Sequence, residues 1–210
     1  MTCTVSAVDE AEGSSRDRIL DAALALFASR GYAGTSTAEI QKASGMSPGS
    51  GALYRHFRSK NDVLRAALRR GLERMRISPA WRQATEPAAR SDALTNVATA
   101  TRETILGNAD LVRLMLHEPE AASELVDELW IRNLSHAHAI MGHALRATAD
   151  AAGTEVEDPE AISAVLLAAL SYMPVMEVLL GRPPGDMDPE RFQAAWLRLS
   201  RAAFTRGVPD

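Results

Sequence analysis

The hydrophobic positions along the chain recur at helical spacing. Between Arg16 and Gly31 the apolar residues fall three and four positions apart, and the same spacing returns over residues 60–76. A further segment, residues 159–180, is apolar almost all round, which is typical of a helix covered on most sides. Strand-like alternation and strong hairpin signals are absent from the sequence. The pattern therefore predicts an all-α protein.

Glycine and proline divide the rest of the chain into further helices. The pattern breaks between residues 77 and 89, where Pro79, Trp81 and Pro87 interrupt it, so we expect a loop and a domain boundary there. The predicted domains are therefore residues 15–76 and residues 77–210, preceded by a polar arm over residues 1–14 that we expect to be disordered. The helices predicted for the second domain span about 88–107, 109–117, 119–152, 158–181 and 188–206.

Two helices joined by a tight turn are predicted between Thr35 and Lys60. Ser36 and Glu39 form an S-x-x-E capping box, in which each side chain satisfies a free backbone N–H at the start of a helix. Gly45 suits the turn, and Ser47 is predicted to cap a second helix with proline at its first position. This order is the helix-turn-helix signature, whose second helix enters the DNA major groove.

The same segment carries a specific set of residues at fixed distances: Ala22, Leu26, Phe27, Gly31, Tyr32, Thr35, Ser36, Ile40, Gly45, Ser47, Leu53, Tyr54, His56, Phe57, Ser59, Lys60 and Leu64. Together they resemble the DNA-binding domain of the TetR family of bacterial transcriptional repressors, over roughly residues 15–68. One feature departs from the common form. Five residues, Pro48–Ala52, separate the turn serine from Leu-Tyr, where about three are usual, so the segment before the recognition helix is longer and rich in glycine.

Charge is distributed unevenly along the chain. The whole protein has a net charge of −4, but residues 15–76 hold 12 Lys and Arg against 5 Asp and Glu, a net +7. Residues 1–14 carry −3 and residues 77–210 carry −8. A basic segment followed by an acidic remainder is the charge pattern expected when a DNA-contacting domain is joined to a domain with a different function.

Chemistry and the resemblance together indicate which residues contact DNA. Phosphates bind Lys, Arg, hydroxyls and helix N-termini, and the resemblance implies this role for Thr37, Tyr54, His56 and Lys60. Arg55 is the best candidate for a guanine contact, because its fork matches O6 and N7. The full set of candidate DNA-contacting residues is Ser36, Thr37, Ser47, Ser50, Gly51, Ala52, Tyr54, Arg55, His56 and Lys60.

Other interpretations of three of these residues stay open. Tyr54 also fits a half-buried core position, His56 fits a capping or solvated histidine, and Arg55 fits a phosphate contact or a surface residue without a role.

The resemblance implies a homodimer that forms through the last two helices, because family members bind DNA as two-fold dimers. Residues 159–180 and a stripe along the last helix then make a four-helix interface with a second subunit. The alternative is that both helices bury their apolar faces in the core of their own subunit. The candidate interface residues are Leu166, Leu170, Phe192, Ala195, Trp196 and Leu199.

A small-molecule effector site in the second domain is also implied by the resemblance. Trp130, Leu134, His138 and Met141 stand 4, 4 and 3 positions apart and so share a helix face. Methionine and aromatic side chains adapt to varied apolar ligands, although ordinary core packing explains each of these residues equally well. The candidate ligand-binding residues are Met115, Leu116, Trp130, Leu134, His138, Met141, Tyr172, Met173 and Met176.

Several function classes find no support in the sequence. The single cysteine, Cys3, excludes an internal disulfide and fits a reducing cytosol. The histidines at 136, 138 and 143 lack metal-ligand spacing, and nucleotide or catalytic motifs are missing, so we expect no metal, no cofactor and no enzymatic activity. Without an uncharged run of 18 residues or a secretory signal, we expect a cytoplasmic protein that does not bind membranes.

The sequence thus predicts an all-α protein with an N-terminal three-helix helix-turn-helix DNA-binding domain and a C-terminal helical domain for ligand binding and dimerisation. Its expected function is a TetR-like repressor that binds double-stranded, near-palindromic operator DNA as a homodimer and is released by a small, apolar ligand. Three alternatives remain: a regulator with a protein effector or none, an activator, and a helical enzyme or ligand-binding protein that does not bind DNA.

Overall fold

The computed structural model describes residues 4–47, 49, 51–85 and 92–206, and for residues 4–14, 119–130, 205 and 206 it describes the backbone alone. The chain forms two compact units. The first consists of Met1–Leu72 and Asp110–Glu128, and the second of Glu73–Ala109 and Leu129–Asp210. The predicted division at residue 76 therefore lies close to the first crossing, but residues 110–128 belong with the first unit.

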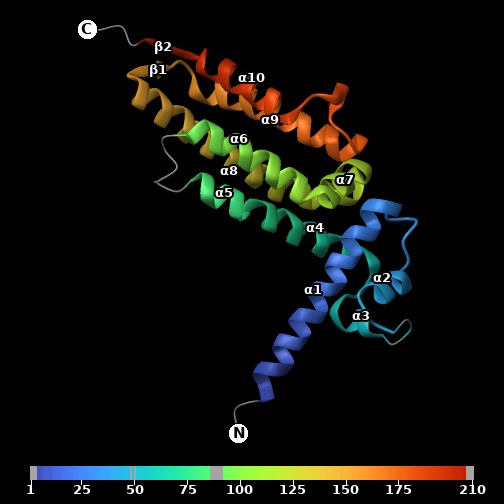
Figure 1. Ribbon diagram of the computed structural model, residues 1–210. Helices are drawn as coiled ribbons and strands as arrows, with labels where there is room; N and C mark the ends of the chain where they lie inside the picture. Colours follow the sequence, from blue (N-terminus) through green and yellow to red (C-terminus); the bar gives the residue numbers. More distant parts are fainter. Residues whose placement is uncertain (1–3, 48, 50, 86–91, 207–210) are drawn as a thin grey trace. The chain divides into compact units, whose positions relative to one another are not determined.

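All regular secondary structure in the described part of the first unit is helical (Figure 1). It contains α1 (Thr4–Arg30), α2 (Thr37–Ala43), α3 (Ala52–His56), most of α4 (Lys60–Arg76), most of α7 (Ala109–His117) and the beginning of α8 (Pro119–Ala152). Its fully buried side chains come from all of these helices whose side chains are described: Ile19, Leu20, Phe27, Ile40, Leu53, Leu64, Leu68, Leu72, Leu111 and Leu114.

Gly71 explains how α4 and α7 approach each other within this unit. A Cβ atom at Gly71 would lie 3.0 Å from Cδ1 and 3.2 Å from Cδ2 of Leu111, closer than nearly all real Cβ contacts. The missing side chain therefore makes room for Leu111, which is fully buried. Leu111 thereby packs segment 110–128 against α4 within the first unit.

The structure corrects two expectations for the first unit. The arm over residues 1–14, which we expected to be disordered, is helical in its described part, because α1 begins at Thr4. The recognition helix α3 begins at Ala52 and not after Ser47, since Gly51 occupies its N-cap with a left-handed backbone at φ 68°. The long glycine-rich segment is therefore a turn, and α3 is short.

The second unit packs helices side by side. It contains α5 (Pro79–Ala84), α6 (Ala93–Gly107), most of α8, α9 (Pro159–Leu180), the short 3-10 helix η2 (Pro184–Asp186) and α10 (Pro189–Arg201). Helix α6 contacts both α5 and α9, and α9 contacts α10 (Figure 1). The helices predicted at 60–76, 109–117 and 119–152 are confirmed, and those predicted at 158–181 and 188–206 correspond to α9 and α10.

Two local elements of the second unit were not predicted. Helix α5 occupies the expected loop because Ser78 caps it, accepting a hydrogen bond from Trp81 N–H, and Pro79 stands at its first position. Short strands β1 (Thr154–Val156) and β2 (Phe204–Arg206) pair antiparallel, with Val156 opposite Phe204. Three-residue strands are too short to produce a recognisable alternation in the sequence.

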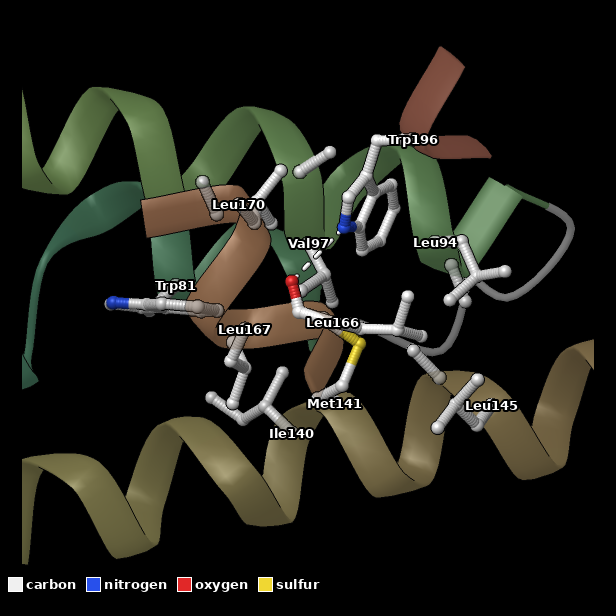
Figure 2. Packing of buried hydrophobic residues seen from close by; sticks show 14 residues of the cluster. Trp81, Leu94, Val97, Ile140, Met141, Leu145, Leu166, Leu167, Leu170 and Trp196 are labelled. Carbon is white, nitrogen blue, oxygen red and sulfur yellow. Dashed lines mark hydrogen bonds between the residues drawn. The ribbon is translucent and has the colours of Figure 1, made fainter. Parts of the chain in front are cut away.

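The core of the second unit is built around a hydrogen bond between α9 and α10. The indole Nε1 of Trp196 donates to the backbone carbonyl of Leu166 at 3.0 Å, and Trp196 is 3% exposed. Figure 2 shows Met141 and Leu145 of α8 facing this pair, with Trp81 farther along the cluster. The polar atom of this buried tryptophan is thereby satisfied within the protein.

Helix α9 is long and apolar enough to cross a membrane by length and composition, which the sequence expectation did not anticipate. One of its faces lies in the core of the helical second unit, where Leu166, Leu170, Met173 and Val178 are buried. Packing within the unit accounts for the apolar composition of that face, as in the core helix of a helical protein.

Replacing Trp196 by Phe should lower the free energy of unfolding by about 1–3 kcal/mol, because the hydrogen bond to Leu166 is lost and the smaller ring leaves a gap. Chemical denaturation of both proteins measures this difference. Arg198→Ala, at an exposed position of the same helix, is the matched control and should change stability by no more than about 0.5 kcal/mol. Equal stability of Trp196→Phe and the wild type would contradict this description of the core.

Candidate nucleic-acid interface and ligand cavity

The start of α2 is fixed by the predicted capping box. The backbone N–H of Glu39 donates to Ser36 Oγ at 3.2 Å, and the backbone N–H of Ser36 donates to Glu39 Oε2 at 2.8 Å. These bonds from Ser36, together with the charge of Arg30 2.9 Å away, hold the pKa of the Glu39 carboxyl below its ordinary value. Ser36 was predicted to contact DNA. In the structure its side chain caps α2.

The turn between α2 and α3 is tied down by Gln41, which sequence reasoning missed. Gln41 is buried, and its Oε1 accepts a hydrogen bond from the backbone N–H of Gly49 at 3.3 Å. Its backbone carbonyl accepts from Met46 N–H at 2.8 Å. One residue of α2 therefore holds both ends of the long turn. A polar residue beside the apolar Ile40 was the only signal in the sequence.

Helix α3 and the start of α2 present hydroxyl groups side by side. Tyr54 is 56% exposed, and its hydroxyl lies 3.4 Å from Thr37 Oγ1. His56 is half-buried beside the Phe57 ring. Arg55 is exposed, and its side chain makes no hydrogen bond or ion pair within the described part of the chain. The half-buried core position considered for Tyr54 is therefore wrong, and the side chains suited to phosphate and base contacts share a short helix.

Lys60 has a role that differs from the one the resemblance implies. Its Nζ donates to the backbone carbonyls of Tyr32 at 2.7 Å and Thr35 at 2.8 Å, and lies 4.1 Å from the centre of the Tyr32 ring. The ammonium group therefore holds the loop between α1 and α2, with at most one of its three N–H donors left for a phosphate. Lys60 positions the interface more than it contacts DNA.

The candidate DNA-contacting residues around the start of α3 divide into two groups. Ser47 is exposed and Gly51 half-buried, whereas Ala52 is 7% exposed and packs in the core, so that it cannot reach a base edge. Ala52 is buried because α3 begins there and turns its first residue inward. Ser50 lies outside the described residues.

Two cations that sequence reasoning did not single out also belong to this surface. Lys42 in α2 and Arg58 after α3 are exposed, and their side chains make no hydrogen bond or ion pair within the described residues. By contrast, Arg70 is paired with Asp17 and Asp21. The excess of basic residues in the sequence indicated that cations would be present in this segment. Only the structure separates the cations with free side chains, such as Lys42, from those already in ion pairs, such as Arg70.

A cavity of about 100 Å³ lies inside the second unit. Most of its wall is apolar, and its lining residues come from the end of α4 and from α5, α6, α8 and α9: Met75, Arg76, Trp81, Thr101, Thr104, Ile105, Asn133, Leu134, His136, Ala137, Leu167 and Ser171. The apolar, partly enclosed shape is that of a small-molecule site.

Leu134 is the only predicted ligand residue whose described side chain lines this cavity. Met115 and Leu116 belong to the first unit, Met141 is fully buried in the core and Tyr172 is 54% exposed. His138 and Met173 line other cavities, and half-buried Met176 does not line this one. Only the backbone of Trp130 is described. The predicted residues follow one helix face, whereas the wall of this cavity is assembled from α4, α5, α6, α8 and α9.

Most of the polar groups around the cavity are already paired. Ser78 Oγ and Thr104 Oγ1 share a hydrogen bond of 2.8 Å, and Thr101 donates to a carbonyl of its own helix. Arg76 donates to Glu73 at 2.6 Å, which lowers the pKa of the Glu73 carboxyl and raises that of Arg76. His136 and Ser171 make no hydrogen bond within the described part of the chain, so they are available to a ligand.

The predicted dimer residues also divide by exposure. Leu166, Leu170 and Trp196 are buried in the core of their own unit, so the alternative of burial within the subunit holds for these three. Phe192 packs partly against the same core, and Ala195 is half-buried. Leu199 is 71% exposed. The indole of Trp196 also finds a polar partner in this core, the Leu166 carbonyl, and an apolar pattern in the sequence does not reveal such a partner.

The described fold and interface define a helix-turn-helix protein with a separate helical unit. Residues 19–67 match the family described as bacterial regulatory proteins, tetR family, so this segment is a tetR-family DNA-binding domain. The resemblance found in the sequence is thereby confirmed.

Individual proteins agree with this assignment. The HTH-type transcriptional regulator AcrR of Shigella flexneri is 47% identical over 49 residues, which cover 23% of this chain and 22% of that protein. A TetR transcription regulator from Haloarcula marismortui has a similar fold, with a TM-score of 0.72, 17% identity and coverage of 92% of this chain and 100% of that one. The transcriptional regulator FadR from Bacillus subtilis, in complex with stearoyl-CoA, has a TM-score of 0.64 and 17% identity, with coverage of 90% of this chain and 98% of that one.

Replacing Lys60 by Ala should destabilise the first unit by about 1–2 kcal/mol, because two backbone carbonyls lose a charged donor.

Lys42→Ala is the matched control. It should leave stability unchanged, because the Lys42 side chain makes no such bonds, but should reduce the salt dependence of DNA binding by about one phosphate contact. Denaturation and salt-resolved binding measure the two effects. An unchanged stability for Lys60→Ala would show that its bonds do not hold the loop.

Proposed function

We propose that the protein is a repressor that binds a near-palindromic operator as a homodimer and leaves it when a small, mostly apolar ligand binds. The observation that carries this proposal is the exposed surface of α2 and α3, where the Thr37 and Tyr54 hydroxyls lie together beside an unpaired Arg55. Hydroxyls and cations on a short exposed helix serve phosphate and base contact.

The roles of individual residues follow from their exposure. Thr37, Tyr54 and His56, with the cations Lys42 and Arg58, contact phosphates and fix the position of α3 on the duplex. Arg55 reads a base edge from the major groove. Phosphate contacts supply affinity that depends on salt, and the base contact supplies discrimination.

The outward face of α9 supports a dimer. Val165 and Tyr172 are 65% and 54% exposed, and with Leu179 they stand seven residues apart, which places them on one line along the helix. Leu199 of α10 is 71% exposed. Large apolar side chains in a row mark a protein interface. The two-fold symmetry of such a dimer matches two operator half-sites about 34 Å apart.

The cavity of the second unit sets the size and chemistry of the ligand. At about 100 Å³ it is smaller than the roughly 150 Å³ that accommodates benzene, so a ligand is compact or widens the cavity as it binds. Its apolar wall and the free groups of His136 and Ser171 favour an apolar body with one hydrogen-bonding group. A solved neighbour with the same fold, FadR, holds stearoyl-CoA.

The coupling between ligand and DNA runs through the segments shared by the two units. The chain passes between them within α4, near the start of α7 and within α8. Glu118, between α7 and α8, accepts a hydrogen bond from the Tyr32 backbone N–H at 2.9 Å, directly beyond the end of α1. A ligand that favours another arrangement of α4 and α8 thereby shifts the population of DNA-competent dimers.

Selection of bound sites from random DNA tests the DNA-binding part of the proposal and yields the operator. On that operator, Arg55→Ala should relax specificity at one base position per half-site and cost about 1–3 kcal/mol. Arg58→Ala, the matched control, should weaken binding to all sequences alike. A uniform loss from Arg55→Ala would contradict its role as a base reader.

Filling the cavity tests the ligand-binding part. Leu134→Trp should leave operator affinity unchanged, because Leu134 lies outside the first unit, but should abolish release by any small apolar molecule found active on the wild type in a binding screen. Ile131→Trp, an exposed position on the same helix and outside the cavity wall, should keep the response. A full response from Leu134→Trp would place the effector site elsewhere.

A further inference from the structure

A second cavity of the second unit, about 160 Å³ in volume, lies between α8 and the first turns of α9. It shares no lining residue with the first cavity. His136 lines the first cavity and His138 the second, and residues two apart on a helix point to different sides. We propose that this cavity binds a small carboxylate, at a site formed by Arg146, Ser163 and the space above Gly142.

The side chain of Ser163 is the first reason. Ser163 is 2% exposed, and its Oγ has no hydrogen-bond partner within the described part of the chain. A buried helical hydroxyl commonly donates to the carbonyl four residues earlier, as Thr148 and Ser200 do in this unit, each at 2.8 Å. Because an unsatisfied buried hydroxyl is unfavourable, the exception made by Ser163 points to a partner that enters the cavity it lines.

Gly142 is the second reason. A Cβ atom at this position would lie 3.4 Å from Arg146 Nη2 and 3.6 Å from Ser163 Oγ. Two hydrogen-bond donors from different helices therefore converge on the space that the missing side chain leaves. Gly142 lies in the interior of α8 without a positive φ, where alanine would be favoured by about 1 kcal/mol. Backbone conformation does not require glycine here, and a Cβ atom would occupy the space beside the two donors, in contact with both.

The charges around the cavity select the ligand class. Arg146 is exposed on α8 and has no ion-pair partner among the described residues, so its planar fork is free to bind a carboxylate. His138 adds an imidazole, and Glu160 adds a carboxylate of the protein itself. Arg146 attracts an anion and the Glu160 carboxylate repels it, and because this repulsion grows with the charge of the ligand, a monoanion is favoured over a doubly charged phosphate. Ala139 and Pro159 supply an apolar wall for a short alkyl chain.

Titration calorimetry with propionate at constant ionic strength tests the proposal, with propylamine and inorganic phosphate as comparison probes. The wild type should bind one propionate per chain saturably, and the comparison probes more weakly. Gly142→Ala, Ser163→Ala and Arg146→Gln should each weaken propionate binding by about tenfold or more, as expected for loss of a bond to a charged group. Arg191→Ala, an exposed arginine of α10, should bind like the wild type.

Thermal unfolding without propionate separates loss of the site from loss of the fold. Gly142→Ala should raise the melting midpoint through helix propensity, and Ser163→Ala should leave it unchanged or raise it, because an unsatisfied hydroxyl is removed. Binding that is lost in variants with unimpaired stability supports the site. Three results would overturn the proposal. They are no saturable binding of propionate to the wild type, unchanged affinity in both Gly142→Ala and Ser163→Ala, or phosphate binding as tight as propionate binding.

Discussion

The ammonium group of Lys60 holds together the segments on which the DNA-binding unit depends. Its bonds to the carbonyls of Tyr32 and Thr35 join the start of α4 to the loop that links α1 and α2. The N–H of Tyr32 in turn donates to Glu118, from the segment between α7 and α8. A residue whose charge suggests DNA contact thus fixes the framework that presents other residues to DNA. Buried or half-buried charges are stabilised by such convergent polar groups.

The recognition helix depends on this framework because it is too short to be stable alone. Five residues make little more than one turn, and isolated helices of that length do not form. Its position is therefore imposed from outside, by burial of Leu53 and Phe57 and by Gln41, which accepts a bond from Gly49 in the preceding turn. The extra residues of that turn are accommodated by the left-handed backbone of Gly49 and Gly51.

Much of the fold follows from local patterns in the sequence. The capping box at Ser36, the span of α4 and the positions of α7 and α8 could be predicted because caps, prolines and apolar periodicity act over a few residues. The start of α3 could not, since Ser47 and Pro48 form a convincing helix start that the glycine at position 51 overrides. The roles of Lys60 and Ala52 depend on distant partners, and local pattern does not contain them.

The candidate ligand cavity was the least predictable feature for the same reason. Its wall is assembled from several helices, and Trp81, which lines it, belongs to a helix that appeared to be a loop. Periodicity finds an apolar face but does not say whether that face meets a core, a cavity or a partner. Leu166, Leu170 and Trp196 illustrate this: their stripe is regular, and the core of their own unit covers it.

The central claim is that the basic helix-turn-helix segment within residues 15–76 reads DNA sequence. The most direct test measures binding of the full chain to a fragment from upstream of its own gene and to random DNA of equal length, over a range of salt concentrations. We predict tight binding to the upstream fragment with a steep salt dependence, and binding to random DNA that is weaker by about a thousandfold or more. Equal, weak binding to both fragments would contradict the account.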